Sequence, residues 1–194
     1  HHGQLRKSGE PYITHPLEAV KLLLTLKPDL VSIQACILHD VIEDTERTKA
    51  DIEKLFGHDV AIICEGLSKL SAIKYRGEER TIESLRKMFI AMVDDLRVII
   101  VKLADRLHNM QTLEHHPEKT KRDRIALETL NIYAPIADRL GIFDFKEALE
   151  TECFKILFPV EHAQIQLELS ELREEQDFFL GKAKTIIREV VKES

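Results

Sequence analysis

The sequence is organised around nine residues in which a histidine and three carboxylates interrupt an apolar stretch: Cys36-Ile37-Leu38-His39-Asp40-Val41-Ile42-Glu43-Asp44. At about 100° per residue, His39 lies above Glu43 and Asp40 lies above Asp44 on one face of a helix. Burial of an isolated carboxylate is costly unless a cation, a proton or strong donors compensate for it. The flanking side chains are apolar, so a bound metal ion explains the four polar groups better than a solvated helix edge does.

The composition indicates one globular domain, or one domain with an appendage. The chain has 194 residues, of which 44% are hydrophobic, and this is enough for a sizeable core. Its 28 basic and 34 acidic residues give a net charge of −6, which favours neither nucleic acid nor an anionic membrane as a partner. No apolar run approaches the roughly 20 residues that span a bilayer, and no signal-peptide pattern opens the chain, so we expect a cytoplasmic protein.

Apolar residues recur with helical periodicity along the chain and no strand pattern interrupts them, which predicts an all-α fold. We expect one helix from about residue 29 to 44 with Asp29 as its N-cap, and another from about 49 to 56 that begins with a capping box of Thr48 and Asp51. Further helices are expected over residues 16–24, 60–70, 81–93, 96–113, 118–140, 143–158 and 161–193.

Two of these helices change character along their length. The 96–113 segment starts as an apolar, central helix and then carries Asp105, His108, Asn109 and Thr112 at helical spacing, which makes one polar strip. The 118–140 segment contains a proline, and this predicts a kink or local break.

The polar groups of three helical segments form a candidate metal site. Two imidazoles and two carboxylates come from His15, His39, Asp40 and Asp105. Mixed nitrogen and oxygen ligands suit manganese, iron, zinc or magnesium, although a histidine pair makes magnesium alone a poorer match. The Glu-Asp pair at 43–44, one turn beyond, is placed to orient or deprotonate a water molecule on the metal, and the inferred reaction is metal-assisted hydrolysis.

Three segments, 3–16, 38–45 and 102–110, closely resemble the HD hydrolase domain of the RelA/SpoT family, whose members make and degrade the alarmones guanosine tetraphosphate and pentaphosphate. Residues 128–141 look like the connector that leads from hydrolase to synthetase in that family. The resemblance implies an all-α HD-domain fold with C-terminal connector helices. We expect a hydrolase domain over residues 1–140 and a helical connector over 141–194.

The resemblance implies a manganese-dependent 3′-pyrophosphohydrolase of the stringent response, which converts the alarmone to GDP or GTP and pyrophosphate. One divalent ion, Mn²⁺, would be held by the four residues of the candidate metal site. Glu43 and Asp44 would be the pair linked to water activation. Members in which this signature has decayed lack hydrolysis, whereas this chain keeps it.

The resemblance also implies a substrate site. Arg6, Lys7 and Ser8 fall where the family holds the guanine base and a nearby phosphate, and Asn109 and Thr112 fall where it contacts the nucleoside. An arginine plane over a purine and a lysine beside phosphate are physically reasonable. The alternatives are that the two cations are surface charges, the threonine bonds its own helix backbone, and the asparagine is a satisfied core amide.

Other polar residues have simpler interpretations. We expect His108 to support the site indirectly and Arg106 to pair with one of its carboxylates. Surface positions are expected for His58, His115, His116 and His162. A basic, mobile loop is expected over residues 72–80. We interpret Lys74, Arg76 and Arg80 as charges of a solvated loop, with screening of a polyphosphate as the alternative.

The last helix is followed by no Gly-rich phosphate loop or second catalytic segment, so we expect no alarmone synthesis by this chain. The connector-like segment favours a piece of a long bifunctional enzyme with a synthetase domain. The expected partner is the guanosine tetraphosphate or pentaphosphate substrate, with no nucleic acid and no membrane. Two alternatives remain: a phosphohydrolase for other 3′-phosphorylated nucleotides, and a catalytically silent nucleotide-sensing domain.

Overall fold

A computed structural model describes residues 3–71 and 95–192. These residues form helices and turns, with one isolated β-bridge between Leu5 and Pro11, and the predicted all-α fold is confirmed. None of the described helices is both long and apolar enough to cross a membrane. The helix expected at 81–93 and the basic loop expected at 72–80 lie outside the described residues.

The chain divides into two compact units, residues 1–156 and 157–194. The second unit consists of α11 (Pro159–Lys192). The functional boundary expected after residue 140 remains a prediction. The first unit contains α1 (Thr14–Leu24), α2 (Leu30–Leu38), α3 (Val41–Asp44), α4 (Lys49–Phe56), α5 (His58–Ser71), α7 (Leu96–Gln111), α8 (Lys119–Glu128), α9 (Ala134–Arg139) and α10 (Phe143–Leu157).

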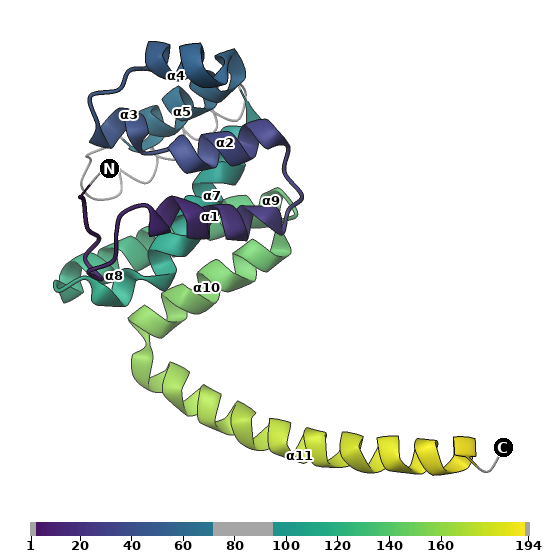
Figure 1. Ribbon diagram of the computed structural model, residues 1–194. Coiled ribbons are helices and arrows are strands. Elements are labelled where there is room, and N and C mark those ends of the chain that lie inside the picture. Colours follow the sequence, from purple (N-terminus) through teal and green to yellow (C-terminus); the bar gives the residue numbers. More distant parts are fainter. Residues whose placement is uncertain (1–2, 72–94, 193–194) are drawn as a thin grey trace. The chain divides into compact units, whose positions relative to one another are not determined.

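Helix α7 is the centre of the first unit, and α1, α2 and α5 pack against it (Figure 1). Its apolar half is enclosed, with Ile99, Val101 and Leu103 completely buried. Because the helix continues through this interior, Asp105 and His108 are buried as well. Two members of the predicted polar strip therefore lie inside the protein, where each polar group needs a partner, whereas Asn109 and Thr112 are half-buried.

The single helix predicted over residues 29–44 is wrong, because it breaks at His39 and Asp40. The Asp40 backbone has φ −94° and ψ −3°, between α2 and α3. A side-chain bond competes with the helix here, since Nδ1 of His39 lies 2.7 Å from the Cys36 carbonyl oxygen that Asp40 N–H would otherwise approach. The break separates the four polar residues: His39 is buried, whereas Glu43 and Asp44 are exposed.

The predicted local break near Pro135 is confirmed. The helix widens into a π-helical turn at Thr129–Tyr133, between α8 and α9. Proline has no N–H to donate to the carbonyl four residues earlier, and its ring crowds that carbonyl, so the preceding turn changes its hydrogen-bond pattern. Such π-helical turns occur frequently at functional sites.

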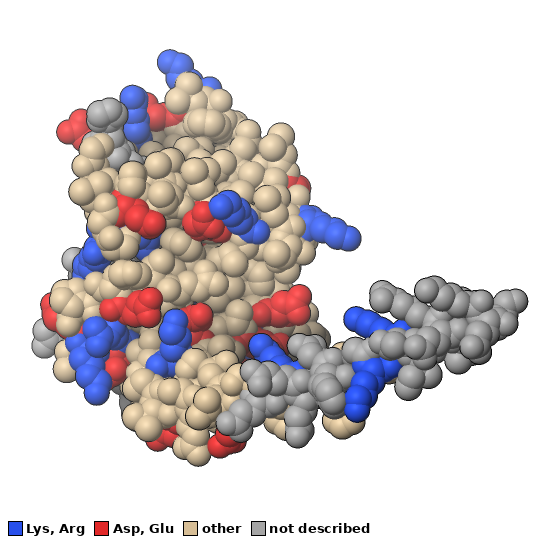
Figure 2. Space-filling view, turned by 60° about the horizontal axis from the view of Figure 1, so that its bottom comes forward, with Lys and Arg blue, Asp and Glu red and all other residues tan. Residues whose placement is uncertain are grey.

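The described surface is charged with both signs, and Figure 2 shows acidic and basic side chains interspersed on one face. This agrees with the nearly balanced count of 28 basic and 34 acidic residues. Within α11 several large apolar side chains are more than half exposed, among them Leu167 and Phe179.

The N-cap of α2 provides a test of the helix that leads to His39. Asp29 Oδ1 accepts the Ser32 backbone N–H at 2.8 Å, and Asp29 Oδ2 pairs with Arg97 at 2.9 Å. We expect Asp29→Ala to lower the free energy of unfolding by about 1 kcal/mol, because the N–H loses its acceptor. Asp29→Asn keeps an acceptor and loses only an exposed ion pair, so it should remain near wild type. Urea denaturation followed by circular dichroism measures both, and equal losses would contradict the cap assignment.

Candidate active site

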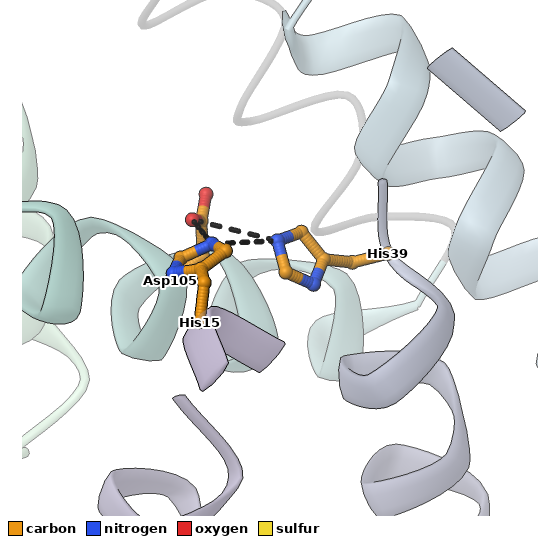
Figure 3. Close-up of side chains that lie close together, drawn as sticks. All are labelled: His15, His39 and Asp105. Atoms are coloured by element: carbon orange, nitrogen blue, oxygen red, sulfur yellow. Dashed lines mark hydrogen bonds and ion pairs between the residues drawn. The ribbon is translucent and has the colours of Figure 1, made fainter. Parts of the chain in front are cut away.

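Three buried side chains from different parts of the fold converge on one point. His15 comes from α1, His39 from the break after α2, and Asp105 from α7 (Figure 3). The Nε2 atoms of the two histidines lie 3.2 Å apart, and Asp105 Oδ1 lies 3.1 Å from His15 Nε2 and 3.5 Å from His39 Nε2. Two nitrogens and one oxygen thus face a common centre, with all three ligand atoms within 4.8 Å of one another.

The other ring nitrogens orient the two imidazoles. His39 Nδ1 donates to the Cys36 carbonyl at 2.7 Å, which leaves Nε2 to face the centre. His15 Nδ1 lies 2.7 Å from Nδ1 of His108, so one of these atoms donates to the other. Burial, together with His15 and Arg6, lowers the pKa of His108 to about 4, so its ring is neutral. His108 is therefore suited to accept the His15 proton, and this supports its predicted indirect role.

Asp105 is held from two sides. Lys102 Nζ donates to Oδ2 at 2.8 Å, and Asn109 Nδ2 donates to Oδ1 at 2.6 Å. Burial by itself would raise the pKa of Asp105, but Lys102, His15 and His39 hold it well below its usual range. The carboxylate is therefore ionised and fixed in orientation.

The charges of the site fit a divalent cation. Burial by itself would lower the pKa of His39, but hydrogen bonds and charges from Asp105 and Asp40 raise it to about 10. Without a metal ion, the buried imidazole thus holds a proton beside two carboxylates. A metal ion would replace this positive charge, and two imidazoles with a carboxylate are a common donor set for first-row divalent metals. The residues present therefore fit the implied metal.

Asp40 lies at the edge of this centre, with Oδ2 3.1 Å from His39 Nε2 and 3.8 Å from His15 Nε2. The hydroxyl of Tyr12 bonds Asp40 and also lies 2.9 Å from Asp44 Oδ2. Burial, followed by the bond to Asp40, raises the pKa of Tyr12, so the phenol keeps its proton. Tyr12 thereby connects the metal centre to the exposed carboxylate of Asp44.

A cavity of about 490 Å³ opens beside the centre. His15, Asp40 and Asp105 line it, whereas Glu43 and Asp44 do not. The cavity also brings together all five residues that the sequence assigned to the substrate, namely Arg6, Lys7, Ser8, Asn109 and Thr112. Its volume is within the range of about 300–1,000 Å³ that small-molecule sites occupy.

Arg6 connects the N-terminal turn to α7 inside this cavity. Its Nη2 donates to Asn109 Oδ1 at 3.0 Å and to Thr112 Oγ1 at 3.2 Å. The turn is closed by backbone bonds from Arg6 N–H to Glu10 and from Tyr12 N–H to Gln4. Gly9 adopts φ +86°, a left-handed conformation that favours glycine. The turn conformation therefore explains the glycine of this motif, and the bonds to Asn109 and Thr112 explain its arginine.

Sequence reasoning missed several residues of the site. Tyr12 lies in the turn before α1 and Lys102 lies in the apolar half of α7, where no spacing rule marks either residue. Arg106 does pair with a carboxylate, but with Glu128 at 3.3 Å rather than one at the metal centre, and it stacks 4.0 Å above the ring of Tyr133. The surface position expected for His116 is wrong, because this residue is only 6% exposed and lines the cavity.

Comparisons with known proteins agree with this geometry. The HD domain family matches residues 1–143. The chain is 47% identical over 195 residues to the bifunctional (p)ppGpp synthase/hydrolase SpoT of Escherichia coli K12, covering all of this chain and 26% of that protein. It is 50% identical over 161 residues to a guanosine-3′,5′-bis(diphosphate) 3′-pyrophosphohydrolase of Vibrio cholerae, covering 82% of this chain and 23% of that protein.

A GTP pyrophosphokinase of Myxococcus xanthus is also 47% identical over 192 residues, covering 97% of this chain and 25% of that protein. The chain thus spans about a quarter of the length of the curated relatives it matches. A solved structure described as a metazoan ortholog of SpoT that hydrolyzes ppGpp has a TM-score of 0.56 at 24% identity, covering 80% of this chain and 86% of that one. At this identity the likeness supports the fold.

The contact between His15 and His108 predicts an effect on metal affinity. We expect His108→Phe to weaken Mn²⁺ binding about 10- to 100-fold, because the His15 ring loses the partner that orients it. His108→Gln retains an acceptor oxygen and should lose less. Calorimetric titration with Mn²⁺ measures the affinity, and His58→Phe, at an exposed position, is the control. Unchanged affinity in His108→Phe would show that the contact does not orient the ligand.

Proposed function

The chain belongs to the HD domain family, and we propose that it hydrolyses guanosine tetraphosphate and pentaphosphate at the 3′ position, releasing pyrophosphate and GDP or GTP. One observation carries the proposal: a buried His-His-Asp centre opens into a cavity whose wall holds Arg6 bonded to Asn109 and Thr112. The names of the SpoT and pyrophosphohydrolase relatives support this choice of substrate.

We propose Mn²⁺ as the metal, held by His15, His39 and Asp105, with Asp40 as a fourth ligand. Support for the first three comes from their convergent ligand atoms, and support for Asp40 from its distance of 3.1 Å to His39 Nε2. When bound, the cation would supply Lewis-acid activation of water and neutralisation of phosphate charge. Lys102 and Asn109 would keep Asp105 ionised and aligned for this ligand set.

Glu43 and Asp44 would orient the attacking water and accept its proton. The Tyr12 hydroxyl supports this role for Asp44, because it connects that carboxylate to Asp40 at the metal centre. The oxygen of the water would join the phosphorus bonded to the ribose 3′-oxygen. The bond from that phosphorus to the 3′-oxygen would break, and the 3′-oxygen would take up a proton as pyrophosphate leaves.

The cavity would orient the substrate along α7. With the 3′-diphosphate at the metal centre, the nucleoside would lie beside Asn109 and Thr112, and the planar guanidinium of Arg6 would face the base. Lys7 and Ser8 would contact the base or a neighbouring phosphate.

The proposal includes a cellular setting. The chain would be the hydrolase part of a longer cytoplasmic enzyme of the stringent response, with a synthetase domain as its partner in the same polypeptide. Support comes from the bifunctional name of the Escherichia coli relative and from the match to about a quarter of its length.

The proposed reaction has a direct assay. Manganese-loaded protein is expected to release pyrophosphate from guanosine tetraphosphate, with GDP as the second product. Chelation by EDTA should abolish the release of pyrophosphate. Added Mn²⁺ should restore it, because the fold keeps the proposed ligands in position for the ion. Release of single phosphate, or an inert loaded protein, would contradict the proposal and favour another 3′-phosphorylated substrate or a silent sensing domain.

The division of roles at the carboxylates has its own test. We expect Asp44→Ala and Glu43→Ala each to lower kcat at least about 100-fold while metal content stays at the wild-type level, since neither residue is a proposed ligand. Metal analysis and pyrophosphate release measure the two effects. The matched control is Glu46→Ala, which removes an exposed carboxylate just after the Glu43–Asp44 pair. Loss of metal in either variant would make that residue a ligand.

A further inference from the structure

His116 has a polar atom that nothing in the described structure satisfies. Its Nε2 is buried and has no hydrogen-bond partner among the described residues. A buried donor or acceptor without a partner is costly and uncommon in folded proteins. Because His116 also lines the cavity, a ligand bound there would supply the missing hydrogen-bond partner.

The other ring nitrogen determines which kind of partner is missing. His116 Nδ1 accepts the backbone N–H of Glu118 at 3.2 Å, so a neutral ring carries its proton on Nε2. Burial, followed by the charges of Lys7 and Lys121, lowers the pKa of His116 and favours this neutral ring. The unsatisfied Nε2 is therefore a donor, and it requires an acceptor.

The position of His116 indicates which part of a ligand it meets. Asp105 on α7 and Thr112, the residue that caps its C-terminal end, are seven positions apart, which corresponds to about 10 Å along the helix axis. His116 follows the short 3₁₀ turn at Leu113–His115 beyond that point, so it lies away from the metal centre. Leu113 and Ile125 line the cavity with it and would pack on the flat face of a base. Lys7, which also lines the cavity, and Lys121 place positive charge near His116 that suits a phosphate, so the binding experiment must separate the two.

We propose that His116 is a specificity-determining residue that donates its Nε2 hydrogen to an acceptor atom of the substrate's nucleobase. The inference rests on the proposed function for the identity of the base, which is guanine, and not for the presence of the donor. Because Nε2 is shielded from solvent, the contact requires the ring to rotate toward the cavity that His116 lines, away from the Glu118 N–H that now holds Nδ1.

Equilibrium binding to the manganese-loaded chain tests this without turnover. Four ligands separate the parts of the substrate: guanosine 3′-monophosphate has the base but no 5′-phosphate, guanosine 3′,5′-bisphosphate adds the 5′-phosphate, ribose 3-phosphate has the sugar but no base, and inorganic pyrophosphate has neither. A loss of ribose 3-phosphate affinity in His116→Phe would assign the contact to the sugar and overturn the proposal. His116→Phe removes the donor and keeps a ring, whereas His116→Gln keeps an N–H donor. The control is His115→Phe, which changes the neighbouring exposed histidine.

We expect His116→Phe to weaken both guanosine ligands about tenfold and to leave pyrophosphate binding and metal content unchanged. His116→Gln should recover part of the loss, and His115→Phe should bind like wild type. Equal losses for pyrophosphate and the nucleotides would show a merely structural role and overturn the proposal. A loss confined to guanosine 3′,5′-bisphosphate would overturn it by assigning the donor to the 5′-phosphate.

The result of this binding experiment does not depend on whether the chain carries out the proposed reaction. Failure to release pyrophosphate from guanosine tetraphosphate would contradict the proposed function. A base-dependent loss in His116→Phe would still support the contact, and unchanged affinity of both guanosine ligands would refute it.

Discussion

The structure depends on the burial of two imidazoles and a carboxylate that face one another at distances of 3.1–3.5 Å. Polar atoms this close, removed from water, must be hydrogen-bonded, and the buried carboxylate needs a paired positive charge. In the protein alone the positive charge comes from Lys102 and from a proton on His39, whose pKa the two carboxylates raise to about 10 against the effect of burial. In the proposed enzyme a divalent cation supplies this positive charge. The buried cluster therefore has the electrostatic properties that a metal site requires.

The surrounding elements meet this demand in different ways. α7 carries Asp105 into the core, and Lys102 on the same helix stabilises its charge. The break after α2 turns His39 inward and anchors it to the Cys36 carbonyl. α1 brings His15 to the same point, against the neutral ring of His108. Each of the three proposed ligands is thus oriented by a second bond, as expected for a preorganised metal site.

Much of the architecture could be predicted from local chemistry, and the rest depends on contacts between distant segments. The capping box of α4 and the break before Pro135 follow from residue types at fixed spacing, and both are present. The RelA/SpoT resemblance is confirmed by the HD family match and by the SpoT relative. Periodicity missed the break at 39–40, because it does not register a side chain that competes for a backbone carbonyl. It also missed Tyr12 and His116, whose roles arise from packing between segments far apart in the chain.

The central claim is that His15, His39 and Asp105 hold a divalent metal. Crystals grown with Mn²⁺ and measured at the manganese absorption edge test it most directly, because anomalous scattering locates the ion itself. The account predicts one strong anomalous peak at about 2.0–2.3 Å from His15 Nε2, His39 Nε2 and an oxygen of Asp105. A manganese peak elsewhere in the chain, or no peak at this centre in the presence of saturating Mn²⁺, would contradict it.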